Sequence, residues 1–183
     1  DFRNTLNRVI GTGDTTILTA GNYDAVINCS SIISANNSDW NDYYISNTAN
    51  ALNLLKRTDC KLFIQLSTFS IFSSKEALIK NQPNPNSYYG LSKYLSEKIL
   101  QKERKTNTNL VIIRLPIVIG EKKISPDFVK YIYNNAIINK RIKLYAKGQY
   151  LRNIIHITEV IKAIISLLNI EYVKKDNVIN LGS

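Results

Sequence analysis

The sequence predicts a three-layer α/β domain in which helices cover a parallel β-sheet. Three apolar runs of strand length, at 24–29, 61–66 and 109–115, are separated by longer amphipathic stretches of helical length. Strands that alternate with helices along a chain are typical of a parallel sheet flanked by helices. The chain has 183 residues, of which 44% are hydrophobic and 21% charged, so it fits one globular domain of ordinary size.

The first part of the chain supplies the main sheet. Its strands are apolar throughout, which is typical of strands buried on both faces. Between the first two strands, apolar side chains recur at helical spacing at Tyr44, Ala51, Leu54 and Leu55. The elements expected here are a strand over 24–29, a helix over 42–57, a strand over 61–66 ending at Ser67-Thr68, a long polar loop containing 82–87, a helix over 88–105, and a strand over 109–115 that Pro116 halts.

After Gly120 the pattern changes to shorter elements. Thr158 is a suitable N-cap for an apolar helix that runs to Leu168. The elements expected here are a helix over 126–139, strands over 141–145 and 153–157, the helix that begins at Thr158, and a strand over 178–181. We expect residues beyond Gly120 to begin a second, substrate-facing subdomain.

Composition excludes several classes of protein. No apolar run reaches the ~18 residues that a membrane span needs. The polar start at Asp1 shows no signal peptide, and we expect the chain to lack its beginning. Two separated cysteines, Cys29 and Cys60, with one histidine supply no metal site; we expect both thiols to be buried in a cytoplasmic protein. The net charge of +10 is scattered, which favours a solvated surface over nucleic-acid binding.

A tyrosine and a lysine lie four residues apart in the segment 89–93 (Tyr-Gly-Leu-Ser-Lys). On a helix, Tyr89 and Lys93 share a face, and an ammonium one turn away favours the phenolate form of a tyrosine. Such a phenol can exchange a proton while a hydride moves to or from a cofactor. The spacing alone is weak, because Tyr94 and Lys98 repeat it one turn later. Small Gly90 and Ser92 are expected to let a ligand approach.

Two hydroxyl residues, Ser67 and Thr68, end the second predicted strand. Ligands of open α/β sheets bind outside the carboxyl ends of the strands. A hydroxyl at that position can donate to a developing oxyanion. A hydroxyl pair that merely ends a strand is the plain alternative.

A series of segments resembles, in the same order, the extended short-chain dehydrogenase/reductase family, the NAD-dependent epimerase/dehydratase group. These segments are 26–31, 44–55, 63–68, 89–93, 113–120, 152–160 and 180–183. The resemblance implies a Rossmann-type core over 1–120 that lacks its N-terminal glycine-rich βα unit. It also implies a mixed region over 121–183 that contributes a small, discontinuous substrate subdomain and returns to the core.

The resemblance also implies roles for individual residues. Tyr89, Lys93 and Thr68 are the catalytic residues, with Ser67 in reserve for Thr68. Arg152 and Ser70 are implied to contact a nucleotide-sugar, and a guanidinium suits phosphate recognition. The residues implied to contact NAD or NADP are Cys29, Ser30, Ser31, Asn47, Tyr89, Lys93 and Pro116. The lone His156 is expected to be structural.

The activity implied is epimerisation, or reduction of a keto group, on a nucleotide-linked sugar. Many members of the family are homodimers that associate through the helices holding Asn47 and Tyr89. A non-catalytic relative that binds RNA or a protein partner is the alternative, and a truncated, inactive product is a third.

Three departures from the family pattern are visible. Gly11-Thr12-Gly13 has the wrong spacing for a pyrophosphate-binding turn, which the family would place upstream of Asp1. Phe69 and Ser70 follow Thr68, in place of the Asp-Glu pair of the 4,6-dehydratases, which argues against dehydration. Ile117 stands where many members have an asparagine that contacts the nucleotide-sugar.

Overall fold

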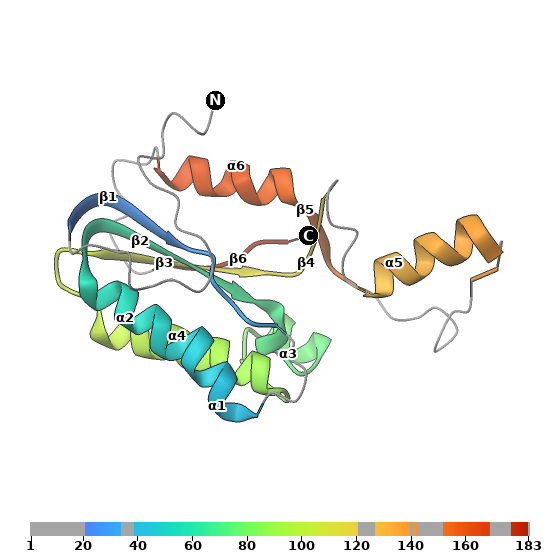
Figure 1. The fold of residues 1–183 in the computed structure, drawn as a ribbon, viewed down its shortest axis with the longest axis horizontal. Helices are drawn as coiled ribbons and strands as arrows, with labels where there is room; N and C mark the ends of the chain where they lie inside the picture. Colours follow the sequence, from blue (N-terminus) through green and yellow to red (C-terminus); the bar gives the residue numbers. More distant parts are fainter. Residues whose placement is uncertain are drawn as a thin grey trace. The chain divides into compact units, whose positions relative to one another are not determined.

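The computed structural model describes residues 21–33, 39–120, 127–139, 141–142, 152–168 and 177–182, drawn in Figure 1. The chain divides into two compact units. The first comprises Asp1–Arg114 with Tyr172–Ile179, and the second comprises Leu115–Glu171 with Asn180–Ser183. Both units are therefore discontinuous in sequence. The expected start of a substrate subdomain after Gly120 stays a prediction, because compactness alone does not identify a substrate-binding region.

The first unit is built on a four-stranded sheet with the strand order β1-β2-β3-β6. Its strands are β1 (Gly21–Asn28), β2 (Thr58–Thr68), β3 (Asn109–Leu115) and β6 (Asn177–Asn180). β1 and β2 run parallel, with Ile27 opposite Ile64, and a helical crossover joins them. The predicted α/β class with a parallel sheet is confirmed.

One face of this sheet is covered by two helices, α2 (Asn50–Arg57) and α4 (Tyr88–Glu103), which lie side by side in Figure 1 and both contact β2. Their inward side chains and those of the strands form the core. Its members are Ala51, Leu55, Cys60, Phe63, Leu100, Leu110 and Ile112. Burial of this apolar surface is the main force that holds the helices on the sheet.

The two cysteines differ in burial. Cys60 is buried in this core, as predicted. Cys29 is exposed at the end of β1, so the prediction of a buried thiol is wrong there. Neighbouring groups nevertheless desolvate the Cys29 thiol and raise its pKa, while Lys93 opposes that rise.

The helical region before β2 consists of α1 (Trp40–Tyr43), a π-helical turn (Tyr44–Ala49) and α2. It matches the single helix predicted over 42–57, except that the middle is wider. The Asn50 N–H donates to the carbonyl of Ile45, five residues back. Such π-turns often occur at functional sites. Here the turn buries the side chains of Asn47 and Thr48.

The segment after β2 is more ordered than the predicted polar loop. A 3₁₀ turn (Phe69–Ile71) is followed by α3 (Lys75–Ile79). The Ser74 hydroxyl accepts from the Ala77 N–H at 3.1 Å, which caps α3. After α3, Asn81 adopts a left-handed conformation (φ 51°), a common way to end a helix.

The second unit contains a pair of parallel strands, β4 (Ile117–Ile119) and β5 (Ile154–His156). α5 (Asp127–Asn134) continues into a π-turn (Asn135–Asn139) within the range predicted as helix. Pro116 separates β3 from β4, as expected of a residue that halts a strand. A strand was predicted over 141–145, but residues 141 and 142 form no strand, and the other three residues lie outside the described residues. The Gly11–Gly13 segment also lies outside the described residues.

The last helix of the second unit, α6 (Ile157–Leu168), begins one residue before the predicted N-cap. Thr158 therefore lies in its first turn. His156 caps the helix instead: its Nδ1 accepts from the Thr158 N–H at 3.3 Å and lies 2.8 Å from the Thr158 hydroxyl. The structural role expected for His156 is thus the capping of α6. In the part of the chain that the structure describes, no helix has the length and apolar character needed to cross a membrane.

Candidate functional site

Tyr89 and Lys93 lie in the first turns of α4, one helical turn apart. The helix begins after Ser87, whose hydroxyl accepts from the Gly90 N–H at 3.1 Å. Tyr89 is half-buried, and Lys93 is 3% exposed. A lysine with so little exposure is rare without a partner or a function.

Gly90 is needed for a reason that differs from the one predicted. A Cβ atom at this position would lie 2.2 Å from the backbone carbonyl oxygen of Ser70. The space is therefore taken by the protein's own backbone and not by a ligand. Ser92 is fully buried, and its hydroxyl donates to the Tyr89 carbonyl at 2.9 Å. The small residues between Tyr89 and Lys93 thus seat the helix and do not open a path for a ligand.

The hydroxyls at the carboxyl ends of β1 and β2 meet the Tyr89 phenol. The side chains of Thr68 and Ser31 lie near enough to the phenol to favour its charged form. Thr68 also accepts from the Ser70 N–H at 3.1 Å. Ser67 points elsewhere, because its hydroxyl donates to the buried carboxylate of Glu97 at 2.5 Å. Of the two predicted hydroxyls, only Thr68 is thus brought to the phenol.

The pKa values in this cluster differ from the expectation. Burial raises the pKa of Tyr89, and the nearby polar side chains of Thr68 and Ser31 oppose that rise. The expectation that Lys93 makes the phenol acidic is therefore wrong for this structure, because desolvation of the phenolate is the larger effect. Burial also lowers the pKa of Lys93 to about 8, opposed by the charges of Glu97 and then Cys29.

Asn47 connects the segment after β1 to α4. Its Oδ1 accepts from the Ile32 N–H at 2.8 Å and from the Ser31 hydroxyl at 3.2 Å. Its Nδ2 donates to the Ile32 carbonyl at 3.0 Å and to the Ser92 hydroxyl at 2.9 Å. A carboxamide offers two donors and two acceptor sites, and all four are used here. Asn47 therefore holds the site together and has no hydrogen-bonding capacity left for a cofactor.

The other predicted cofactor contacts of the first unit follow β1. The Oδ1 of Asn28, a buried residue, accepts from the Ser30 N–H at 3.1 Å and the Ser30 hydroxyl at 2.6 Å. Cys29 lies close enough to Lys93 for their charges to interact. The end of β1, the end of β2 and the start of α4 therefore converge, as expected for a ligand site at the carboxyl ends of parallel strands.

Pro116 and Arg152 belong to the second unit, and their predicted roles toward cofactor and substrate stay predictions. Ser70 is exposed beside Thr68, and its hydroxyl accepts from that of Thr68 at 3.2 Å. Its predicted contact with a substrate also stays a prediction.

Sequence reasoning missed a buried ion pair between Glu97 and Arg114. Arg114 Nη2 lies 2.8 Å from Glu97 Oε2, and both side chains are almost fully buried. Two signals were available. Glu97 lies four residues after Lys93 on the same helix, and Arg114 interrupts an otherwise apolar strand. A charge in a buried strand requires a partner.

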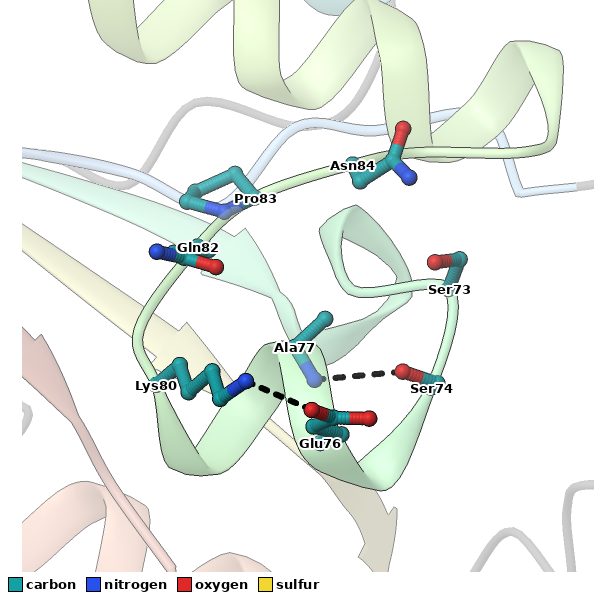
Figure 2. Close-up of a pocket in the computed structure, with 8 residues that line it drawn as sticks. All are labelled: Ser73, Ser74, Glu76, Ala77, Lys80, Gln82, Pro83 and Asn84. Atoms are coloured by element: carbon teal, nitrogen blue, oxygen red, sulfur yellow. Dashed lines mark hydrogen bonds and ion pairs between the residues drawn. The ribbon is translucent and has the colours of Figure 1, made fainter.

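A hollow lined by the segment 73–84 is separate from these residues (Figure 2). Its lining contains no residue of the predicted site. Figure 2 shows the Lys80 side chain directed at the Glu76 carboxylate, and the Ser74 cap of α3. The Lys80 Nζ and Glu76 Oε1 atoms lie 2.6 Å apart. The two charges neutralise each other and both are exposed, so this hollow supplies no clear ligand chemistry.

A parallel α/β sheet, with a Tyr–Lys helix placed beside hydroxyls at the strand ends, defines a Rossmann-type protein of the extended short-chain dehydrogenase/reductase class. A sequence model described as the NAD dependent epimerase/dehydratase family matches residues 12–182. The chain belongs to the NAD-dependent epimerase/dehydratase family. A search of curated proteins found no match.

Solved structures resemble this fold closely. MoeE5 in complex with UDP-glucose and NAD has a TM-score of 0.73 at 18% identity, covering 87% of this chain and 56% of that one. UDP-glucuronic acid 4-epimerase from Bacillus cereus in complex with NAD has a TM-score of 0.70 at 24% identity, with 87% and 53% covered. Helicobacter pylori ADP-L-glycero-D-manno-heptose-6-epimerase has a TM-score of 0.73 at 20% identity, with the same coverage, 87% and 53%. The chain thus spans a little over half the length of these proteins, and at these identities the likeness concerns the fold.

Proposed function

We propose that this chain carries the catalytic part of an NAD-dependent epimerase that acts on a nucleotide-linked sugar. Tyr89 exchanges the proton, Thr68 binds the reacting oxygen, and Lys93 holds the nicotinamide ribose. The observation that carries the proposal is the position of the half-buried Tyr89 phenol, beside the side chains of Thr68 and Ser31 and one helical turn from a buried lysine. The family and the NAD present in two of the similar structures support it.

The residues present fit a dinucleotide. Among the described residues, no hydrogen bond of the Lys93 ammonium is found, although the side chain is 3% exposed. Its three N–H groups are thus available to ribose hydroxyls. Ser30 and Ser31 add hydroxyls after β1, and Cys29 lies nearby. When bound, NAD would supply the acceptor and donor for a hydride.

The chain's own part is to move a proton at the phenol oxygen. In the deprotonated form, Tyr89 accepts the proton of a sugar hydroxyl as the carbon loses its hydride, and it returns the proton when the hydride comes back. The Thr68 hydroxyl steadies the reacting oxygen through a hydrogen bond. Because burial raises the pKa of Tyr89, this chemistry needs an added positive charge near the phenol. The oxidised nicotinamide carries such a charge.

An epimerase and a ketoreductase would use the same three residues. The family favours the epimerase, in which the cofactor is regenerated in each cycle. Consumption of reduced cofactor in proportion to product would instead identify a ketoreductase. The similar structures name both UDP- and ADP-linked sugars, so both nucleotides belong in a substrate screen.

The test compares two tyrosine variants of the full-length protein. Tyr89→Phe removes the phenol that exchanges the proton and should lower kcat by about 10²–10⁴-fold. Tyr94→Phe is the matched control, because Tyr94 and Lys98 have the same spacing on the same helix. Lys98 Nζ lies 5.3 Å from the Tyr94 ring centroid, and Lys98 is exposed. The control should retain activity within about twofold.

Equal activity of the two variants on every converted sugar would refute the assignment of Tyr89. The alternative, a non-catalytic RNA-binding relative, predicts a different result. RNA affinity would fall steeply with salt and would not change in Tyr89→Phe.

A further inference from the structure

The Glu97 carboxylate lies at the centre of a buried polar network. Arg114 Nε donates to Oε1 at 3.1 Å and to Oε2 at 3.2 Å, and its Nη2 donates to Oε2 at 2.8 Å. The Ser67 hydroxyl donates to Oε1 at 2.5 Å. Glu97 is 1% exposed. These bonds join α4, the end of β2 and β3.

Arg114 extends this network to the segment after β2. Its Nη1 donates to Asn81 Oδ1 at 2.8 Å. Its guanidinium carbon lies 5.4 Å from the centroid of the Phe72 ring, a cation–π contact. The left-handed conformation of Asn81 places its side chain within reach of Arg114. The same ion pair therefore anchors both ends of the segment that contains Thr68 and Ser70.

A buried ion pair is a costly way to hold a fold together. Well-packed apolar side chains of similar volume are often as stable or more stable, because they need no desolvation of charge. Here the pair lies beside the proposed site. Ser67 precedes Thr68 in the chain, and Lys93 lies one turn before Glu97 on α4.

The groups that face Lys93 show what the carboxylate adds. Tyr89 and Glu97 flank it on α4, and Cys29 approaches it from the end of β1. Tyr89 and Cys29 are both neutral at pH 7, because burial raises the pKa of each. Among the residues that the structure describes, Glu97 is thus the group that supplies negative charge to the buried ammonium at neutral pH, and it opposes the lowering of the Lys93 pKa.

We propose that Glu97 is a positioning residue that keeps Lys93 charged and, through Ser67, holds the neighbouring Thr68 in place. This inference rests on the proposed function, since it assigns Glu97 a role in the same site. Arg114 fixes the carboxylate so that it serves both neighbours at once. Glu97 touches neither substrate nor cofactor in this role.

The test is a titration of Lys93 by NMR in protein with isotope-labelled lysine side chains, which needs no catalytic activity. The signal of Lys93 is the one lost in Lys93→Arg. In the unmodified protein it should titrate near pH 8. Glu97→Gln keeps the shape and an acceptor for Ser67 but removes the charge, so the midpoint should fall by about 1 pH unit.

The matched control is Glu76→Gln. Glu76 also pairs with a lysine four residues later, Lys80, at 2.6 Å, but both side chains are exposed. This variant should leave the midpoint of Lys93 unchanged. If Glu97→Gln folds poorly because Arg114 is left unpaired, Glu97→Gln/Arg114→Gln removes both charges and should show a smaller fall, because the loss of the Arg114 cation favours the Lys93 ammonium. An unchanged midpoint in folded Glu97→Gln, or a midpoint in the double variant no lower than that of Arg114→Gln alone, overturns the inference.

Kinetics give the second readout and separate the two proposals. If the proposed function holds, Glu97→Gln should change kcat by a larger factor than it changes KM for NAD. As the pH is raised, the variant should lose activity at a lower pH than the unmodified enzyme, because its Lys93 loses the proton earlier. A purely structural role predicts a loss of stability with the pH profile unchanged, and it overturns the inference. Inactive unmodified protein with a shifted Lys93 titration would refute the proposed function and leave the electrostatic role of Glu97 standing.

Discussion

Replacing Lys93 with methionine should make the folded chain more stable at neutral pH. Lys93 is 3% exposed, and its pKa falls from 10.5 to about 8 on folding. At about 1.4 kcal/mol per pH unit, this difference corresponds to about 3 kcal/mol of destabilisation wherever the lysine is charged in both states. Methionine fills similar space without the charge. The lost attraction to Glu97 is already included in the pKa, so the expected gain is about 3 kcal/mol before differences in packing.

The stability difference between the unmodified chain and Lys93→Met should depend on pH. Between about pH 8 and 10.5, the unfolded chain binds the Lys93 proton and the folded chain does not. The stability of the unmodified chain therefore rises with pH in this window, relative to Lys93→Met. The advantage of the variant should be complete below pH 8 and should vanish by about pH 10.5. All other titrating groups are common to both proteins and largely cancel.

The assay is urea unfolding followed by the fluorescence of Trp40, the single tryptophan, at several pH values. Lys98→Met, one turn or so further along α4, replaces an exposed lysine and should change stability by no more than about 0.5 kcal/mol. A Lys93→Met variant that is less stable at pH 7, or whose difference from the unmodified chain does not vary with pH, would refute the reasoning. A Lys93→Met variant that gains stability and loses the proposed activity would show a common trade-off between stability and activity.

Three further predictions concern positions around the site. Gly90→Ala should lower stability by about 1–3 kcal/mol, because its Cβ would meet the Ser70 carbonyl oxygen at 2.2 Å; thermal unfolding measures this. Asn47→Ala leaves buried polar groups unpaired and should lose at least about 1–3 kcal/mol in urea unfolding, whereas the exposed Asn53→Ala on the same helical region should lose little. If the homodimer implied by the family resemblance forms through α4, Leu91→Glu should shift sedimentation toward the monomer; equal sedimentation of both proteins would contradict that interface.

The parallel sheet was predictable because its strands are buried along most of their length. A run such as Leu110–Ile113 has no polar side that needs water, and its short length, its β-branched residues and the Pro116 that follows it identify a strand. The α3 helix was not predictable in this way. It has five residues and follows a polar, serine-rich segment, so its Ser74 cap is the main sequence signal. The π-turn depends on tertiary contacts of Asn47, which no local pattern contains.

The candidate site, like the fold, was predictable from the sequence only in part. That Thr68 would approach Tyr89 follows from topology, because the carboxyl ends of parallel strands meet at one edge of a sheet. The upward shift of the Tyr89 pKa could not be predicted from the sequence, because the spacing of residues on a helix contains no information about desolvation. The Glu97–Arg114 pair was missed because a charged residue on a helix is usually solvated, and only the third dimension reveals its burial.

The contact between Gly90 and the Ser70 backbone has a consequence for protein engineering. Of the three residues that separate the proposed catalytic pair, the first admits no side chain and the third, Ser92, is fully enclosed. Leu91 is 41% exposed and is the position where a library can be randomised without disturbing the interior. Diversity intended to change which sugar is accepted therefore belongs at Leu91 or on other parts of the chain, with Gly90 and Ser92 left as they are.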